Sequence, residues 1–185
     1  MLAILLAASL AAPVPKAKEV ELFYPTTVGT KRVVETKKGN MTFEFTETVD
    51  KVVEKDGVHT VSIKLNKEVF TYRVSPEGLA CHAPLVDDPM PELKLEVKEG
   101  ETWEHETKVK GQLVKKTTYT LGKREEVTVP AGRYQAVRVE SETTVNGEVS
   151  KLTSWYAPDV GLVKTESGVG NSRVSQELKE FTPGK

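Results

Sequence analysis

The sequence predicts an all-β fold, a strongly curved antiparallel meander that forms a half-barrel or an open barrel. Apolar and polar residues alternate along many short runs, and glycine-containing turn pairs separate these runs. An apolar pattern with the helical period of 3.6 residues nowhere persists over several turns. A parallel sheet built on helical crossovers is therefore excluded.

The alternation is clearest from Met41 to Val53, where the odd positions include Phe43, Phe45 and Val49 and the even positions hold mostly Thr, Glu and Asp. The odd positions are expected to face the core, because successive side chains of a strand point to opposite faces. The same period of two predicts further strands through Val61–Leu65, 70–74, 93–97, 103–109, 113–121, 127–129, 137–145, 152–156 and 162–181.

Turn residues stand where a meander requires reversals. Asp56-Gly57 and Asn146-Gly147 are the strongest hairpin signals, because both central residues of a type I′ turn have positive φ. Lys110-Gly111, Leu121-Gly122 and Pro130-Ala131-Gly132 predict further reversals.

An internal echo indicates two similar halves, residues 24–83 and 93–181. Three pairs of segments correspond in the same order: 28–32 with 99–103, 52–63 with 127–139, and 72–79 with 155–162. The alternative is chance similarity, because strand sequences are monotonous. If the echo is real, each half is one curved sheet and the two join into one continuous structure.

The N-terminal segment predicts export. Residues 1–12 are apolar and free of charged side chains, and the run is shorter than the ~20 residues that cross a bilayer. We interpret it as a signal peptide, followed by a linker at 13–21 and a single β domain at 22–183. The alternative is a frayed N-terminal strand, because no Lys or Arg precedes the apolar run. The mature protein is expected to be secreted or periplasmic and not membrane-spanning.

Charge and cysteine content exclude several classes of protein. The 26 basic and 27 acidic side chains alternate along the chain, and a clustered basic stripe with interleaved aromatics is absent from the sequence, so nucleic acid is not an expected partner. Cys81 is the single cysteine. It rules out an internal disulfide and is expected to be a buried small hydrophobe.

No catalytic, cofactor-binding or metal-binding residues are expected. His59, His82 and His105 stand singly, whereas zinc sites bring several ligands at short fixed spacing. Gly168-Val169-Gly170 lacks the helix that would present phosphate-binding amides, and a Gly-x-Ser-x-Gly nucleophile motif is absent. The glutamates around residues 99–106 are interpreted as a solvated strand face.

Aromatic residues supply the candidate ligand or partner residues, which are Trp103, Trp155 and Tyr156. Trp155 and Tyr156 are neighbours in a predicted strand and must face opposite sides of the sheet. One of the two is therefore expected at a rim or beneath a loop, where an aromatic ring can serve recognition.

Three segments carry a resemblance to known proteins: YPTTVG at 24–29, EVTVPAGRYQAVRV at 126–139 and SWYAPDVGLVK at 154–164. The chain resembles uncharacterised bacterial secreted proteins that are similar to domains of unknown function with a lipoprotein-carrier-like (LolA/LolB-like) half-barrel. The resemblance implies a curved antiparallel sheet open along one side, which takes acyl chains in lipoprotein carriers. Such proteins often carry Trp where this chain has Arg32, which weakens a packing role for that position.

These observations favour a non-catalytic extracytoplasmic binding module. A one-sided sheet must bury its apolar face, and the sequence offers no amphipathic helix to cover it. The sheet either closes and fills itself or accepts a lipid, another apolar ligand or an extended segment of an envelope protein. The alternatives are a structural or assembly component of the cell envelope and a hydrolase with an unrecognised site.

Overall fold

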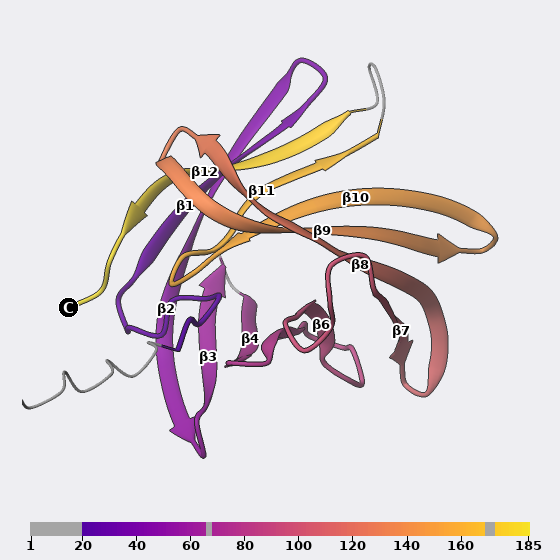
Figure 1. Cartoon of the computed structure of the whole chain (residues 1–185), viewed down its shortest axis with the longest axis horizontal. Coiled ribbons are helices and arrows are strands. Elements are labelled where there is room, and N and C mark those ends of the chain that lie inside the picture. Colours follow the sequence, from indigo (N-terminus) through magenta and orange to yellow (C-terminus); the bar gives the residue numbers. More distant parts are fainter. Residues whose placement is uncertain (1–19, 66–67, 169–172) are drawn as a thin grey trace, which may run out of the picture.

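The computed structural model describes residues 20–65, 68–168 and 173–185; the expected signal peptide, most of the linker and residues 169–172 lie outside the described residues. Twelve strands follow one another along the chain (Figure 1). They are β1 (Lys31–Lys38), β2 (Met41–Lys55), β3 (Val58–Leu65), β4 (Glu68–Ser75), β5 (Gly78–His82), β6 (Met90–Lys94), β7 (Thr102–Val109), β8 (Gln112–Val129), β9 (Gly132–Val145), β10 (Glu148–Ala157), β11 (Gly161–Ser167) and β12 (Val174–Thr182).

All twelve strands form one antiparallel sheet in the order β6-β5-β4-β3-β2-β1-β12-β11-β10-β9-β8-β7. The first and last strands pair in the middle of this row, and β6 and β7 are its two ends. The sheet curls so far that β6 lies next to β7 and β8. The result is a nearly closed barrel with one seam, between β6 and β7, that no strand ladder closes. The predicted fold class is confirmed.

Side-chain and loop contacts hold the seam together. The indole nitrogen of Trp103 on β7 donates a hydrogen bond of 3.0 Å to the carbonyl of Pro91 on β6. The Asp87 amide donates to the Lys108 carbonyl at 3.0 Å. The Asp87 carboxylate accepts hydrogen bonds from the amides of Lys110 at 2.9 Å and Gly111 at 2.7 Å. The loop before β6 is thereby fixed to the β7–β8 turn.

The turn predictions hold at the hairpins and fail at one glycine. Asp56-Gly57 and Asn146-Gly147 have the expected pairs of positive φ angles. Leu121-Gly122 is not a reversal, because β8 continues through it with a register shift between Leu121 and Arg124. A Cβ atom at Gly122 would lie 3.0 Å from the Arg138 carbonyl oxygen, so glycine permits the close approach of β9 at this bend.

Two hydrophobic cores, here called the inner and the outer core, stabilise the sheet. The inner core gathers Val61, Ile63 and Val74 from the first strands with Val139 and Tyr156 from later ones. The outer core forms where the end of the β8–β9 hairpin folds over β11, β12 and β1 (Figure 1). Neighbours in one strand enter different cores, as Tyr156 and Ala157 do, because successive side chains alternate between faces.

The expected burial of odd positions in β2 is wrong at both ends of the strand. Met41 and Phe43 are 53% and 54% exposed, because the β1–β2 hairpin extends beyond the body of the sheet (Figure 1). A register shift between Val49 and Lys51 then turns Val52, rather than Val53, toward the inner core. A bulge inserts one residue and so exchanges the two faces of the strand.

Irregular chain, rather than a helix, covers part of the inner apolar face. Residues 21–24, here called the N-terminal strap, place Phe23 and Tyr24 in the inner core at 1% and 2% exposure. The Asp159 amide donates to the Leu22 carbonyl at 2.6 Å, and the ring of Tyr24 stacks on that of Tyr72 at 4.2 Å between centroids. Of the two alternatives that the sequence left open, filling by the chain itself therefore applies to this part of the barrel. Within the described ranges no helix is both long and apolar enough to cross a membrane.

The two segments matched by the echo at 28–32 and 99–103 have the same backbone hydrogen bonds. Gly29 donates to the Val49 carbonyl at 2.9 Å, and the Val49 amide donates to the Thr30 carbonyl at 2.9 Å. In the same way, the Gly100 amide donates to the Leu121 carbonyl at 2.7 Å, and the Leu121 amide donates to the Glu101 carbonyl at 3.0 Å. Both glycines have positive φ, 84° and 85°. Each set of hydrogen bonds links the residues before one strand, β1 or β7, to the next strand along the chain, β2 or β8.

Candidate functional site

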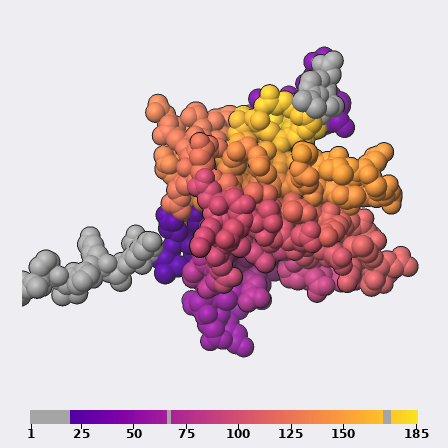
Figure 2. All heavy atoms as spheres, turned by 45° about the vertical axis from the view of Figure 1, so that its right-hand side comes forward, coloured from indigo at the N-terminus to yellow at the C-terminus, as the bar shows by residue number. Residues whose placement is uncertain are grey.

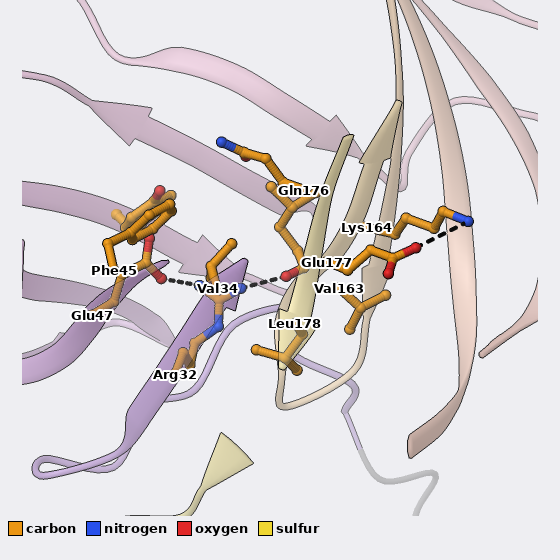
Figure 3. Close-up of a pocket in the computed structure, with 11 residues that line it drawn as sticks. Arg32, Val34, Phe45, Glu47, Val163, Lys164, Gln176, Glu177 and Leu178 are labelled. Atoms are coloured by element: carbon orange, nitrogen blue, oxygen red, sulfur yellow. Dashed lines mark hydrogen bonds and ion pairs between the residues drawn. The ribbon is translucent and has the colours of Figure 1, made fainter. Parts of the chain in front are cut away.

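Arg32 borders a cavity of about 40 Å³ (Figure 3). Its interactions there stabilise the fold. Its guanidinium forms an ion pair with Glu47, donates a hydrogen bond to the Leu162 carbonyl and lies 5.4 Å from the centroid of the Tyr24 ring. Burial alone would lower the pKa of Arg32, but Glu47, Tyr24 and Tyr72 together outweigh it and the pKa is raised. Arg32 is 3% exposed and joins β1, β2, β11 and the strap, so the expected weakening of its packing role is wrong.

A larger cavity of about 180 Å³, here called the trough, lies on the inner face beside the seam. Its lining comes from β6 on one side and β8, β9 and β10 on the other: Met90, Glu92, Lys115, Thr117, Tyr119, Val139, Ser141, Thr143, Leu152, Ser154 and Tyr156. Figure 2 shows the segment from β6 to β8 (pink) lying beside the strands β9 and β10 (orange).

Strand alternation and register place these side chains together. Thr117 pairs with Thr143 and Tyr119 with Ser141 across β8 and β9. Ser141 in turn pairs with Leu152 across β9 and β10. The hydroxyl oxygens of Thr117 and Thr143 are 3.0 Å apart. Because cross-strand partners share one face of the sheet, the inner surface here is a wall of hydroxyl groups rather than of aliphatic side chains.

Glu92 and Lys115 bring opposite charges to the trough. The Tyr156 hydroxyl donates to Glu92 Oε2 at 3.4 Å. Burial raises the pKa of Glu92 to about 7; the hydrogen bond from Tyr156 and the charges of Arg32 and Lys115 oppose this rise, and Glu47 adds to it. Among the described residues, neither Glu92 nor Lys115 takes part in an ion pair.

The three aromatic candidates are separated by the sheet. Tyr156 is buried and lines the trough. Trp103 is buried in the inner core and stacks on Tyr119, with 5.2 Å between ring centroids. Trp155 packs against the outer core, where its indole nitrogen donates to Glu125 at 2.7 Å. The prediction that Trp155 and Tyr156 face opposite sides is confirmed, and the residues form no single aromatic surface.

Sequence reasoning missed Glu92, Lys115 and the hydroxyl wall. Alternating Thr and Ser in strands resemble a solvated face, and the barrel closure that turns this face inward gives no local signal. Glu92 follows Pro91 and precedes the strand predicted at 93–97, so the alternation does not include it.

The described histidines and the cysteine form no metal site. Burial lowers the pKa of His105 on β7, whose Nε2 atom is buried without a hydrogen-bond partner among the described residues. His82 Nε2 lies 2.9 Å from the Val86 carbonyl. Cys81 is buried, and burial raises its pKa to about 12. In the described part of the chain no group of three or more His, Cys, Asp or Glu side chains is placed to hold a metal ion.

Two solved structures share this fold. One is a predicted exported protein with a YmcC-like fold from Bacteroides fragilis, which is 15% identical and has a TM-score of 0.61 over 88% of this chain and 99% of its own. The other is a predicted lipoprotein from Parabacteroides distasonis, which is 16% identical and has a TM-score of 0.52 over 89% of this chain and 100% of its own. At these identities the likeness concerns the fold alone.

Sequence comparison also identifies the family of the chain. No curated protein matches the chain. The DUF3108-like family model matches residues 82–176, more than half of the 185 residues. This span contains every residue that lines the trough, from Met90 to Tyr156. The chain therefore belongs to the DUF3108-like family.

Proposed function

We propose that this protein is a non-catalytic extracytoplasmic binding module and that its ligand occupies the trough. The observation that carries the proposal is a cavity of about 180 Å³ with polar walls, lined by an acidic and a basic side chain that form no ion pair, next to the one seam that no ladder closes. The apolar segment at residues 1–12 supports an extracytoplasmic location. The descriptions of the two structural relatives as an exported protein and a lipoprotein agree with it.

Unsatisfied polar groups beside the trough support binding. Buried polar atoms are costly unless a hydrogen-bond partner is present. His105 Nε2 and Thr107 Oγ1, both on β7, are buried without such a partner in the described structure. They lie opposite Thr117 and Lys115, two lining residues of the trough. A ligand that enters beside the seam would bring hydrogen-bonding groups close to these atoms.

The walls of the trough favour a polar ligand over an acyl chain. The N-terminal strap occupies the apolar part of the interior, whereas most lining residues of the trough carry hydroxyl or charged groups. A hydrocarbon chain would leave these groups without partners, at a cost of about 1–3 kcal/mol for each unsatisfied group. The lipid ligand implied by the lipoprotein-carrier resemblance is therefore the less favoured class.

Assembly of an envelope structure through free sheet edges has weaker support. The edge strand β6 has 5 residues and includes Pro91, which cannot donate to a ladder. The β6 and β7 edges run in opposite directions and face each other. A single extended partner segment between them would pair parallel to one edge, so only a hairpin could form antiparallel ladders with both.

Native mass spectrometry of protein purified from the periplasm without denaturation tests the proposal. We expect a bound small molecule in the wild type and its loss in Thr143→Phe, which adds a ring inside the trough. Thr144→Phe is the matched control, because Thr144 is exposed on the other face of the same strand. Circular dichroism and melting temperature establish that both variants fold. A bare wild-type mass, or equal occupancy in the two variants, would overturn the proposal.

A hydrolase is the second candidate, and one observation favours it. A carboxyl group with a pKa of about 7, hydrogen-bonded to a tyrosine in a cavity, has the properties of a general acid or base. The other acidic group acting on it, Glu47, is ion-paired with Arg32, so a pair of free carboxylates is not assembled there. Turnover of ester or glycoside substrates that disappears in Glu92→Gln would favour this candidate over binding alone.

A further inference from the structure

We infer that the trough recognises a small zwitterion, a molecule of amino-acid size that carries an ammonium group for Glu92 and a carboxylate for Lys115; this inference rests on the proposed function. Both side chains line the same cavity, and they come from different strands, β6 and β8. They do not pair with each other.

The charges select against ligands of one sign. A buried charge is stabilised when an opposite charge and hydrogen bonds satisfy it. A simple cation in the trough would be attracted by Glu92 and repelled by Lys115. A simple anion would be attracted by Lys115 and repelled by Glu92. A ligand with one charge at each end satisfies both groups and leaves the net charge of the cavity unchanged.

The hydrogen bonds around Glu92 leave room for the ammonium group. The Tyr156 hydroxyl is bonded to Glu92 Oε2, and a carboxylate has two oxygens that each accept more than one hydrogen bond, so it can also accept from a ligand ammonium group. The Ser141 and Ser154 hydroxyls of the same lining can serve as further hydrogen-bond partners for the ligand. The wall thus supplies both the charged anchor and the neutral contacts that a small polar molecule needs.

The size of the cavity limits the ligand. A volume of about 180 Å³ corresponds to the liquid volume of about six water molecules. This space fits an amino acid with a short carbon chain and excludes a long peptide or an acyl chain from full burial. A larger ligand could place only one terminal residue in the trough.

Ligand titrations followed by amide NMR test the inference with probes that share a three-carbon skeleton: β-alanine, propionate, propylammonium and propionamide. We expect β-alanine to shift the amide signals of Thr117, Ser141 and Ser154 at concentrations at least about tenfold below those of the singly charged probes, a difference of about 1.4 kcal/mol. Glycine and 4-aminobutyrate, tested alongside, vary the separation of the two charges.

Charge-neutral variants assign the two ends of the ligand. Glu92→Gln should bind β-alanine no better than propionate, and Lys115→Met should bind it no better than propylammonium. Lys116→Met is the matched control, because Lys116 lies on the other face of β8 and pairs with Glu104. It should bind β-alanine as the wild type does.

The possible failures are distinguishable. If none of the amino acids binds better than its singly charged analogues, while native mass spectrometry still detects a molecule that Thr143→Phe expels, the zwitterion inference is overturned and the proposed function stands. If native protein carries no molecule and no probe shifts the trough amides, both are overturned. If Glu92→Gln fails to fold, the comparison of Lys115→Met with Lys116→Met still decides the inference.

Discussion

The inner faces of the two halves of the sheet differ although both belong to the same meander. Strands β3 and β4 turn Val61, Ile63 and Val74 inward, and all three are almost completely buried. Strands β9 and β10 turn Ser141, Ser154 and Thr143 inward around a cavity. The same antiparallel backbone thus accommodates both a filled apolar core and a polar trough, and the inward-facing side chains differ in chemistry between the two regions.

The N-terminal strap accounts for much of this difference. Its two aromatic rings, Phe23 and Tyr24, add apolar volume to the inner core, and Tyr24 is fixed by stacking on Tyr72 and by the guanidinium of Arg32. The trough lies beside the seam, where β6 forms one wall and β8, β9 and β10 form the other. The chain itself therefore fills one part of the interior, and a cavity remains in the other.

The largest effect is expected at the ion pair that joins the strap to the sheet. Arg32→Ala should lower the free energy of unfolding by about 3–5 kcal/mol, because it leaves Glu47 buried without its partner. Urea denaturation measures the loss. The double variant Arg32→Met/Glu47→Leu should recover most of it, since neither charge then remains. A loss below about 1 kcal/mol in the single variant would place this ion pair outside the structural core.

A pair of truncations compares the two inner faces directly. Ile63→Ala should cost about 2–5 kcal/mol, because it opens a cavity in a filled core. Ser141→Ala should cost at most about 1 kcal/mol, because its hydroxyl makes one long hydrogen bond of 3.5 Å to the Leu152 carbonyl. Equal losses in urea denaturation would show that the trough wall is as tightly packed as the apolar core.

The third prediction concerns the pH dependence of stability. The pKa of Glu92 is about 7 in the folded protein and 4.5 as the ordinary value, so the folded state holds an extra proton between these values. The stability supplied by the protonated form is complete below pH 4.5 and is lost as the pH rises through about 7. Glu92→Gln should therefore match the wild type near pH 4.5 and exceed its stability by roughly 3 kcal/mol above pH 8.

The tyrosines and the cysteine that face Glu92 keep their protons over this range, because burial raises their pKa values; they are Tyr24, Tyr72, Tyr119, Tyr156 and Cys81. The charged groups that act on Glu92 are Arg32, Lys115 and Glu47. Denaturation at several pH values checks the prediction. Parallel curves for wild type and Glu92→Gln from pH 4.5 to 8 would contradict the account of a buried, titrating carboxyl group.

The smallest effect is expected at the seam. Trp103→Phe removes the hydrogen bond to the Pro91 carbonyl and should cost about 1 kcal/mol. Hydrogen exchange at the amides of β6 should become faster, because β6 loses a contact with β7. Trp155→Phe removes a comparable bond, to Glu125 on the outer face, and should leave β6 exchange unchanged. Similar exchange in both variants would mean that the indole does not hold the seam.

Sequence reasoning predicted the architecture because its signals are local. Alternation and turn pairs such as Asn146-Gly147 depend on neighbouring residues, and they predicted an antiparallel meander. The errors lie where geometry is not local: the register shifts at Leu121 and Val49, the projecting Met41 and Phe43, and the irregular strap. Bulges leave little trace in composition, because they change pairing rather than residue type.

The candidate site was less predictable than the fold. Tyr156 was selected for its ring, and it lines the trough, whereas Trp155 was selected with it and belongs to the outer core. Glu92 and Lys115 resemble the many other charged residues of wet strands. Only closure of the sheet, which brings β6 against β8, gives these two side chains a shared cavity.

Chemical-shift mapping with the natural ligand tests the central claim most directly. Small molecules released from natively purified protein by denaturation are added back to ligand-free protein, and backbone amide shifts are recorded. The account predicts shifts at Thr117, Ser141 and Ser154 and unchanged signals at Val61 and Val74. Shifts confined to the apolar strands or to the outer face would contradict it.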